Sequence, residues 1–158
     1  MKGLMGWVAG GLMLAHLVLH VGFGWGRGAP DLFTLTLLIA SRRLHVGAAA
    51  GVGFGLGLIE DAFSALSFGA NTFAMTVTGV LGSRSRDFLV GDSLNFLFFY
   101  FLAGKWTRDI LVWIVSEAAV RTSLPTRVFL EAPVAGLYMA VIGVGVVYLM
   151  RRRWVAAE

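Results

Sequence analysis

The fold is decided by the stretch from Gly47 to Gly82, which reads GAAAGVGFGLGLIEDAFSALSFGANTFAMTVTGVLG. An apolar segment dense in glycine runs to an acidic pair, Glu60-Asp61. A short turn through Ser67 then leads to a second apolar segment that carries Asn and Thr. In lipid the backbone must satisfy its own hydrogen bonds, so both segments are predicted to be helices.

Glycines define one face of the first helix. At about 100° per residue, four of them fall on a broad face with Phe54 and Asp61. They are Gly47, Gly51, Gly55 and Gly57. Small residues let a neighbouring backbone come close in a membrane, although each costs a helix in water roughly 1 kcal/mol against alanine. This face is therefore expected to contact another helix, from the same chain or from a partner, while Leu56 on the opposite face contacts lipid.

The composition of the chain is that of a membrane protein. Of its 158 residues, 58% are hydrophobic and 14% are charged, and the mean hydropathy is +0.80. A soluble domain is nearer a quarter charged. The chain has no cysteine, which excludes disulfides and thiolate metal sites. The pI of about 10.1 is attributed to arginines in loops, so no nucleic-acid partner is expected.

An all-α fold of six transmembrane helices is predicted within a single domain, 1–158. The expected spans are about 4–23, 30–41, 45–63, 68–82, 92–119 and 129–150. The second is only about half a span, so it must tilt, borrow loop residues or be sheltered by its neighbours. Residues 83–87 are predicted to form a polar loop. The fifth span is either one helix with buried charges or two segments with a break at Gly104, and one helix is preferred.

Charged residues inside the fifth span predict a buried network of Lys105, Arg108 and Asp109. A charge at the bilayer centre costs at least about 2.5 kcal/mol, so such residues pair with one another and face protein. Lys105 and Asp109 are four positions apart, so they can pair on one helix face.

Two further patterns concern the first and last spans. Gly136, Ala140 and Gly143 form a small-residue stripe, which predicts a helix contact. His16 and His20 are four apart, and a metal pair is conceivable. No acid or third histidine lies near them in the sequence, so helix packing or interfacial hydrogen bonding is favoured.

Basic residues predict the orientation of the chain. One side of the six spans holds eight of the thirteen Lys and Arg residues: Lys2, Arg42, Arg43, Arg84, Arg86, Arg151, Arg152 and Arg153. The other side holds three: Arg27, Arg121 and Arg127. Because loops on the cytoplasmic side carry the excess of positive charge, both termini are predicted to be cytoplasmic.

No catalytic motif is present in the sequence. It contains no dinucleotide fingerprint, P-loop, G-x-S-x-G or H-E-x-x-H. Glu60 and Asp61 are adjacent, so on a helix they point about 100° apart and do not form an acid–base pair. The chain is therefore expected to be a non-enzyme that needs no cofactor, since an intramembrane enzyme would require residues that are missing here.

Several short motifs follow one another in a characteristic order. Pro30-Asp31-Leu32 opens the second helix, Gly53-Phe54-x-x-Gly57-Leu58-x-x-Asp61 lies in the third, and Leu66-x-x-Gly69 opens the fourth. Asp109 follows in the fifth span, and the last span begins with a proline and ends in a basic tail. In this order and over nearly its whole length, the chain resembles the rod shape-determining protein MreD family.

The resemblance implies a scaffold of the machinery that elongates the lateral wall of rod-shaped bacteria, in the cytoplasmic (inner) membrane. It implies association with an MreC-type bitopic protein, and around that pair with the MreB filament, RodA glycosyltransferase and a class B penicillin-binding protein. The family's fold is similar to that of the substrate-binding subunits of energy-coupling-factor vitamin transporters. Lys105 and Arg108 depart from the apolar run that the family has before Asp109.

Two functional hypotheses follow. In the first, the chain is a scaffold, and the glycine faces of the third and sixth spans receive partner helices. In the second, it is a transporter subunit that binds a small molecule or membrane lipid in an outward pocket. The residues expected on the pocket or packing face are Pro30, Asp31, Gly51, Phe54, Gly57, Asp61, Gly69 and Asn71. A copurifying MreC-type partner would favour the scaffold, and a bound ligand would favour the pocket.

Overall fold

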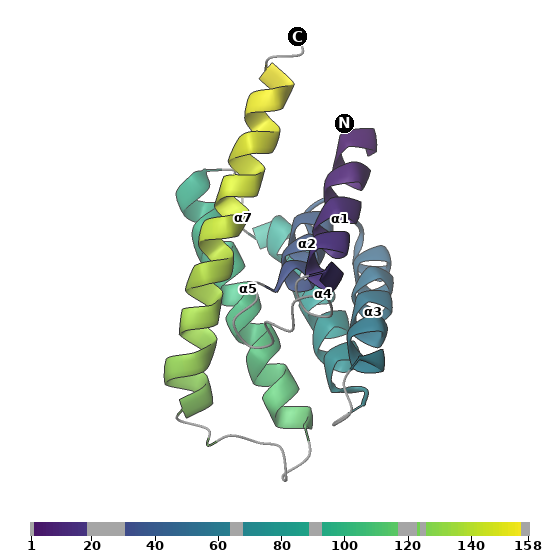
Figure 1. Ribbon diagram of the computed structural model, residues 1–158, viewed down its shortest axis with the longest axis vertical. Helices are drawn as coiled ribbons and strands as arrows, with labels where there is room; N and C mark the ends of the chain where they lie inside the picture. Colours follow the sequence, from purple (N-terminus) through teal and green to yellow (C-terminus); the bar gives the residue numbers. More distant parts are fainter. Residues whose placement is uncertain are drawn as a thin grey trace.

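The computed structural model describes residues 2–18, 31–63, 68–88, 93–116, 123 and 126–155. Within these ranges the chain forms six α-helices and one π-helical turn, and no strand. The elements are α1 (Lys2–Leu17), α2 (Leu32–Ser41), α3 (Val46–Ala62), α4 (Ala70–Phe88), α5 (Leu94–Val115), η3 (Arg127–Glu131) and α7 (Ala132–Val155) (Figure 1). The prediction of an all-α fold is confirmed.

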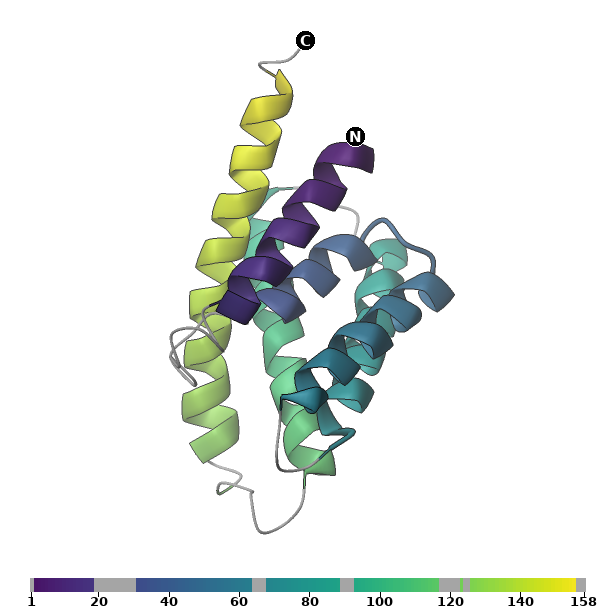
Figure 2. The same cartoon turned by 45° about the vertical axis from the view of Figure 1, so that its right-hand side comes forward.

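The short helix α2 lies at the centre of the bundle, where it contacts α1, α3, α4, α5 and α7 (Figure 2). It has ten residues, and every residue from Leu32 to Leu38 is buried. The hydroxyl of Thr36 donates to the Leu32 carbonyl at 2.7 Å, so this buried polar side chain is satisfied within the helix. This short apolar helix is therefore sheltered by the longer helices around it.

Two hydrophobic clusters meet on α2. One contains side chains of α2, α5 and α7: Leu32, Leu35, Leu38, Leu97, Tyr100, Phe101, Met139 and Ala140. The other contains side chains of α2, α3 and α4: Phe33, Leu37, Leu56 and Met75. Opposite faces of one short helix thus serve as the core of both halves of the bundle, which fixes the two halves relative to each other.

His16 joins the end of α1 to the start of α2. Its Nδ1 accepts a hydrogen bond from the Leu32 N–H at 3.2 Å, and its ring stacks on Phe33 with centroids 4.1 Å apart. The bond satisfies one of the N–H groups that a first helical turn leaves without a partner. This is the packing role that the sequence favoured over metal binding, and His20 lies outside the described residues.

Glycines bring the backbones of α3 and α4 into contact. A Cβ atom at Gly57 would lie 2.5 Å from Thr72 Cα, and one at Gly53 would overlap the α4 backbone. From the other helix, a Cβ at Gly79 would lie 2.5 Å from the Ala49 carbonyl oxygen. Only glycine fits at these three positions, so the α3–α4 crossing is a close small-residue packing of the kind found in membrane bundles.

The predicted packing face of α3 is wrong in part, because Gly57 and Asp61 of that face contact α4 whereas Gly51, Gly55 and Phe54 lie on the open side. An added Cβ at Gly51 or Gly55 would meet nothing within 4 Å, and Phe54 is 52% exposed. Leu56, which was expected to face lipid, is only 4% exposed and belongs to the core between α2 and α4.

The error arises because two series of small residues alternate along this helix at the same spacing. The series that packs is Ala49, Gly53 and Gly57, whereas the predicted face combined Gly57 with Gly47, Gly51 and Gly55. Asp61, four residues after Gly57, continues the packing series and contacts the start of α4. The side chain of Asp61 thus lies on the same face of α3 as the packing series.

The small-residue stripe of α7 contacts helices of the same chain. A Cβ at Gly136 would lie 3.0 Å from Leu102 Cδ1, and one at Gly143 would lie 2.6 Å from Phe101 Cδ2. Ala140 is buried in the cluster between α2, α5 and α7. The hypothesis that this stripe receives a partner helix is therefore corrected, because α5 already covers it. A Cβ at Gly51 or Gly55 of α3 meets nothing within 4 Å, so a partner helix on that side of α3 stays a prediction.

Helix α4 continues to Phe88, through residues 83–87 that were predicted to form a loop. Ser83 is buried, and its hydroxyl donates to the Leu44 carbonyl at 2.8 Å. Because the connection after α2 supplies this acceptor, the polar residue is satisfied without the helix ending.

Helix α5 runs unbroken through Gly104, so the prediction of one helix in this region is confirmed. It has 22 residues but carries three charges in its second half. Within the described part of the chain, a single helix, Phe129–Arg152 with 24 residues, is long and apolar enough to cross a membrane. α2 is apolar but too short to do so.

Candidate functional site

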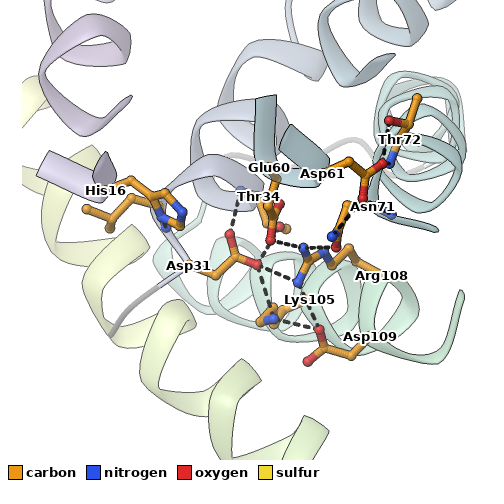
Figure 3. A network of polar contacts seen from close by, with 11 residues as sticks. His16, Asp31, Thr34, Glu60, Asp61, Asn71, Thr72, Lys105, Arg108 and Asp109 are labelled. Carbon is orange, nitrogen blue, oxygen red and sulfur yellow. Dashed lines mark hydrogen bonds and ion pairs between the residues drawn. The ribbon is translucent and has the colours of Figure 1, made fainter. Parts of the chain in front are cut away.

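Five charged side chains gather where α2, α3 and α5 meet (Figure 3). We call them the buried charge network: Asp31, Glu60, Lys105, Arg108 and Asp109. Four of these side chains are at most 10% exposed, and Glu60 is 23% exposed. The network is therefore an interior feature that connects helices rather than a solvated surface.

Three members come from one face of α5, because residues three and four positions apart are neighbours on a helix. Lys105 Nζ lies 2.6 Å from Asp109 Oδ1, as the spacing predicted. Arg108 Nη1 lies 3.3 Å from the same oxygen. Two cations thus converge on one carboxylate within a single helix.

Asp31 joins the start of α2 to this face of α5. Its Oδ2 lies 3.1 Å from Lys105 Nζ and 3.2 Å from Arg108 Nη1. The same carboxylate caps α2, because the Thr34 N–H donates to Oδ1 at 2.9 Å and the Thr34 hydroxyl donates to Oδ2 at 2.7 Å. A carboxylate at this position also suits the positive end of the helix dipole. One residue therefore starts α2 and fixes it to α5.

The guanidinium of Arg108 is the hub of the network. Its Nη1 faces Asp31 and Asp109, and its Nη2 donates to Glu60 Oε1. Nη2 also donates to Asn71 Oδ1 at 2.7 Å. One planar fork thus contacts α2, α3 and α4 as well as its own helix. A lysine would offer a single point charge in place of these directed donors.

Asn71 links the network to the cap of α4. Its Oδ1 accepts from Arg108, and its Nδ2 donates to Asp61 Oδ1 at 3.0 Å. Asp61 also accepts from the N–H groups of Gly69, Asn71 and Thr72 at 2.9 to 3.1 Å, and from the Thr72 hydroxyl at 2.6 Å. These N–H groups are the unpaired donors of a first helical turn, where a carboxylate is favoured. Gly69 has φ of +93°, which glycine adopts without strain.

The predicted pocket residues are divided between the interior and the surface. Asp31, Asp61 and Asn71 are connected through Arg108, as Figure 3 shows. Phe54 is exposed on the other side of α3, so the expected pocket wall of Phe54 and these polar residues does not form.

The other residues that were predicted for this face lie at separate places in the fold. Gly57 lies in the α3–α4 contact, Gly69 forms the turn before α4, and Gly51 is on the open side of α3. Pro30 lies outside the described residues.

Three participants in these contacts were not predicted from the sequence: Glu60, Thr34 and Thr72. Glu60 and Asp61 were set aside as a catalytic pair because adjacent helical residues diverge. The same divergence lets Glu60 reach α5 while Asp61 reaches α4. The signal available was the rarity of two adjacent acids at the end of an apolar helix.

The network holds helices together by pairing most of its donors and acceptors, but Glu60 Oε2 and Arg108 Nε are buried without a hydrogen-bond partner within the described residues. In the described ranges no group of three His, Cys, Asp or Glu side chains is placed to hold a metal ion. Removing one partner of a buried ion pair strongly destabilises a protein, because the other charge is left buried and unpaired. The arrangement of α2, α3, α4 and α5 therefore depends on a few residues.

Comparison with known proteins identified no relative of the chain. No protein-family model, no curated protein and no solved structure matches the chain.

Proposed function

We propose that this chain is a multi-pass protein of the bacterial cytoplasmic membrane and a scaffold of the cell-elongation machinery. The functional part rests on the resemblance of its motifs to the MreD family, and the six spans would be arranged as in the substrate-binding subunits of energy-coupling-factor transporters. Its direct partner would be an MreC-type bitopic protein. The MreB filament, RodA and a class B penicillin-binding protein would be reached through that complex.

The observation that carries the membrane location is the apolar outer surface. On η3 and α7 the exposed large side chains are Phe129, Leu130, Val134, Leu137, Tyr138, Val141, Tyr148 and Leu149. On α3 and α5 they are Val52, Phe54, Leu58, Ile59, Leu94, Phe99, Trp106, Ile114 and Val115. Soluble monomers rarely expose contiguous apolar patches larger than a few hundred Å². Lipid tails would cover these faces.

The distribution of charge supports the same location. Charged side chains at membrane depth face the protein interior and pair with one another. The buried charge network has this arrangement, since its five members lie between helices while the outward faces of α3, α5 and α7 carry large apolar side chains. The charges within α5 are thus compatible with a transmembrane helix.

The ends of the bundle support the proposed orientation. α1 begins and α7 ends at the same end of the molecule, and the α2–α3 connection lies toward that end (Figures 1 and 2). Exposed arginines occur in that connection, in the last turns of α4 and at the end of α7: Arg43, Arg84, Arg86, Arg151 and Arg152. Positive charge at this end favours placing it in the cytoplasm.

The scaffold role is supported by how the polar interior is used. Asp31, Asp61, Asn71 and Arg108 form hydrogen bonds and ion pairs with one another and with helix termini of the same chain. A rigid frame of this kind presents its outer faces to other proteins without having to reorder itself, which lowers the entropic cost of association.

Orientation can be tested with single cysteines, because the chain has none of its own. Arg43→Cys and Arg84→Cys, both at exposed positions, should be shielded in intact cells from a membrane-impermeant thiol reagent. Ser123→Cys, exposed between α5 and α7, should react readily. All three should react after the cells are permeabilised. The reverse labelling pattern in intact cells would overturn the proposed topology.

The scaffold proposal predicts a stable complex. When the MreC-type protein of the same genome is co-expressed, it should remain bound through detergent extraction and affinity capture of this chain. An unrelated bitopic protein at the same expression level serves as the control. Absence of the MreC-type protein from a captured, folded sample would count against the scaffold role while leaving the membrane location standing.

A further inference from the structure

The buried charge network contains more negative than positive charge. Among the described residues that form it, three carboxylates face two cations: Asp31, Glu60 and Asp109 against Lys105 and Arg108. An excess charge held away from water is unfavourable unless a counter-charge accompanies it. One further positive charge would balance the network.

Glu60 is the member of the network that lacks a full positive counter-charge. Its Oε1 pairs with Arg108, whereas its Oε2 is buried and has no hydrogen-bond partner within the described residues. Asp31, by comparison, is contacted by both cations and by Thr34. Glu60 is also the most exposed member, at 23%, although Oε2 itself is buried, so the carboxylate would have to turn outward to meet a group from another molecule.

Asp61, the neighbouring acid, does not share this deficit. From the end of α3 its carboxylate reaches the start of α4, where three backbone N–H groups and two side chains donate to its two oxygens. The positive end of a helix dipole offsets a carboxylate at this position. The unmatched charge therefore belongs to Glu60.

The surface beside Glu60 is apolar. Ile59 and Phe63 lie within one turn of it along α3 and are 38% and 64% exposed. Val52, seven residues before Ile59, is 36% exposed and lies on the same side of the helix. These three side chains form a strip along α3, and Glu60 lies in the last turn of that helix. This end of α3 lies away from the chain termini (Figure 1).

We propose that this strip receives the transmembrane helix of a partner, and that a Lys or Arg near the outer end of that helix pairs with Glu60. Charge complementarity selects this occupant, because a wholly apolar helix or a lipid tail would leave Oε2 without a donor. A basic side chain supplies the donor and the missing charge together. The inference rests on the proposed membrane scaffold and adds the chemistry by which the partner is recognised.

The test uses designed bitopic proteins of known sequence. Each has a fluorescent protein on its cytoplasmic side and a span of about 20 Leu and Ala residues. One carries a single Lys one turn inside the outer end, a second carries Gln at that position, and a third carries the Lys one turn inside the inner end. Each is co-expressed with the affinity-tagged chain, which is captured in mild detergent, and the co-captured fluorescence is measured.

The wild-type chain should retain the outer-Lys span about tenfold better than either of the other two, since buried interhelical polar contacts in membranes are worth about 1–2 kcal/mol. Glu60→Gln should abolish this preference, and Glu60→Asp, which keeps the charge, should retain most of it. The thermal stability of each variant is recorded alongside. Should Glu60→Gln fail to fold, the wild-type comparison of the three spans and the Glu60→Asp variant decide the question.

Equal retention of the three spans by the wild type would overturn the inference, as would a preference for Lys that survives Glu60→Gln. Either result would mean that the missing charge is supplied by another source, such as a proton or a metal ion. Because the designed spans are unrelated to the MreC-type protein, the two tests are independent. If the MreC-type protein is retained and the outer-Lys span is not, the inference fails while the scaffold function stands.

Discussion

Replacing Arg108 with alanine is expected to lower the free energy of unfolding by about 3–5 kcal/mol, the usual cost of removing one partner from a buried ion pair. The side chain contacts Asp31, Glu60 and Asp109, so its loss would leave three carboxylates with Lys105 as the one cation of the network. The effect would be measured by unfolding of the purified protein in detergent and by the yield of folded protein from membranes.

Three companion variants make this prediction specific. Arg84→Ala, at an exposed position, should change stability by no more than about 0.5 kcal/mol. Arg108→Lys should lie between the wild type and Arg108→Ala, because lysine keeps the charge but cannot direct donors to several acceptors. Glu60→Gln added to Arg108→Ala should recover part of the loss. A cost below about 1 kcal/mol for Arg108→Ala would contradict its role as the hub.

Gly57→Ala is expected to destabilise the protein by about 1–3 kcal/mol or more, although it adds a single methyl group. That methyl would lie 2.5 Å from Thr72 Cα and 2.6 Å from the Asn71 carbonyl oxygen. Both are backbone atoms, so the helices α3 and α4 would have to separate. Separation would also draw Asp61 away from the N–H groups that it caps. Thermal unfolding in detergent measures the effect.

Gly55→Ala is the matched control, two residues earlier on the same helix. A Cβ there would meet nothing within 4 Å. The substitution should be neutral or slightly stabilising, because alanine has the better helix propensity by up to about 1 kcal/mol. If Gly55→Ala and Gly57→Ala cost the same, close packing of α3 on α4 would not explain the requirement for Gly57.

The helices could be predicted because hydrophobic runs, and the turn-forming and polar residues that end them, are local signals in the sequence. The apolar stretch at about 92–119 favoured one helix in spite of its charges, and one helix is present from Leu94 to Val115. The end of α4 could not be predicted in this way. The hydroxyl of Ser83 finds its acceptor at Leu44, 39 positions away, so the polar run from 83 to 87 resembled a loop when considered alone.

Within the site, only the contact between Lys105 and Asp109 could be predicted from spacing, because it lies within one helix turn. The contacts of Arg108 with Asp31 and Glu60 join separate helices. No periodicity encodes such contacts, since they depend on how the helices cross. Asp31 was singled out through the family resemblance, and Glu60 was considered only as half of a catalytic pair.

The face of α3 could not be chosen from glycine spacing. Positions 47, 51 and 55 and positions 49, 53 and 57 repeat at the same interval, so helix geometry favours neither set. The choice depends on the facing helix α4, because Gly79 and Thr72 of α4 need small residues opposite them on α3. The glycine-rich composition correctly predicted that α3 makes a close helix contact. Which face of α3 makes that contact depends on α4.

The central position of α2 has a consequence for the order in which the protein is made. Asp31 emerges from the ribosome roughly 75 residues before Lys105 and Arg108, its two counter-ions. At about 5–20 residues per second, the start of α2 waits for roughly 4 to 15 seconds before either cation exists. A nascent chain that ends before α5 therefore holds an uncompensated acid on a helix too short to span the bilayer. The segment that forms the middle of the finished bundle is thus synthesised before four of the helices that surround it, α3, α4, α5 and α7, and cannot complete its contacts until they exist.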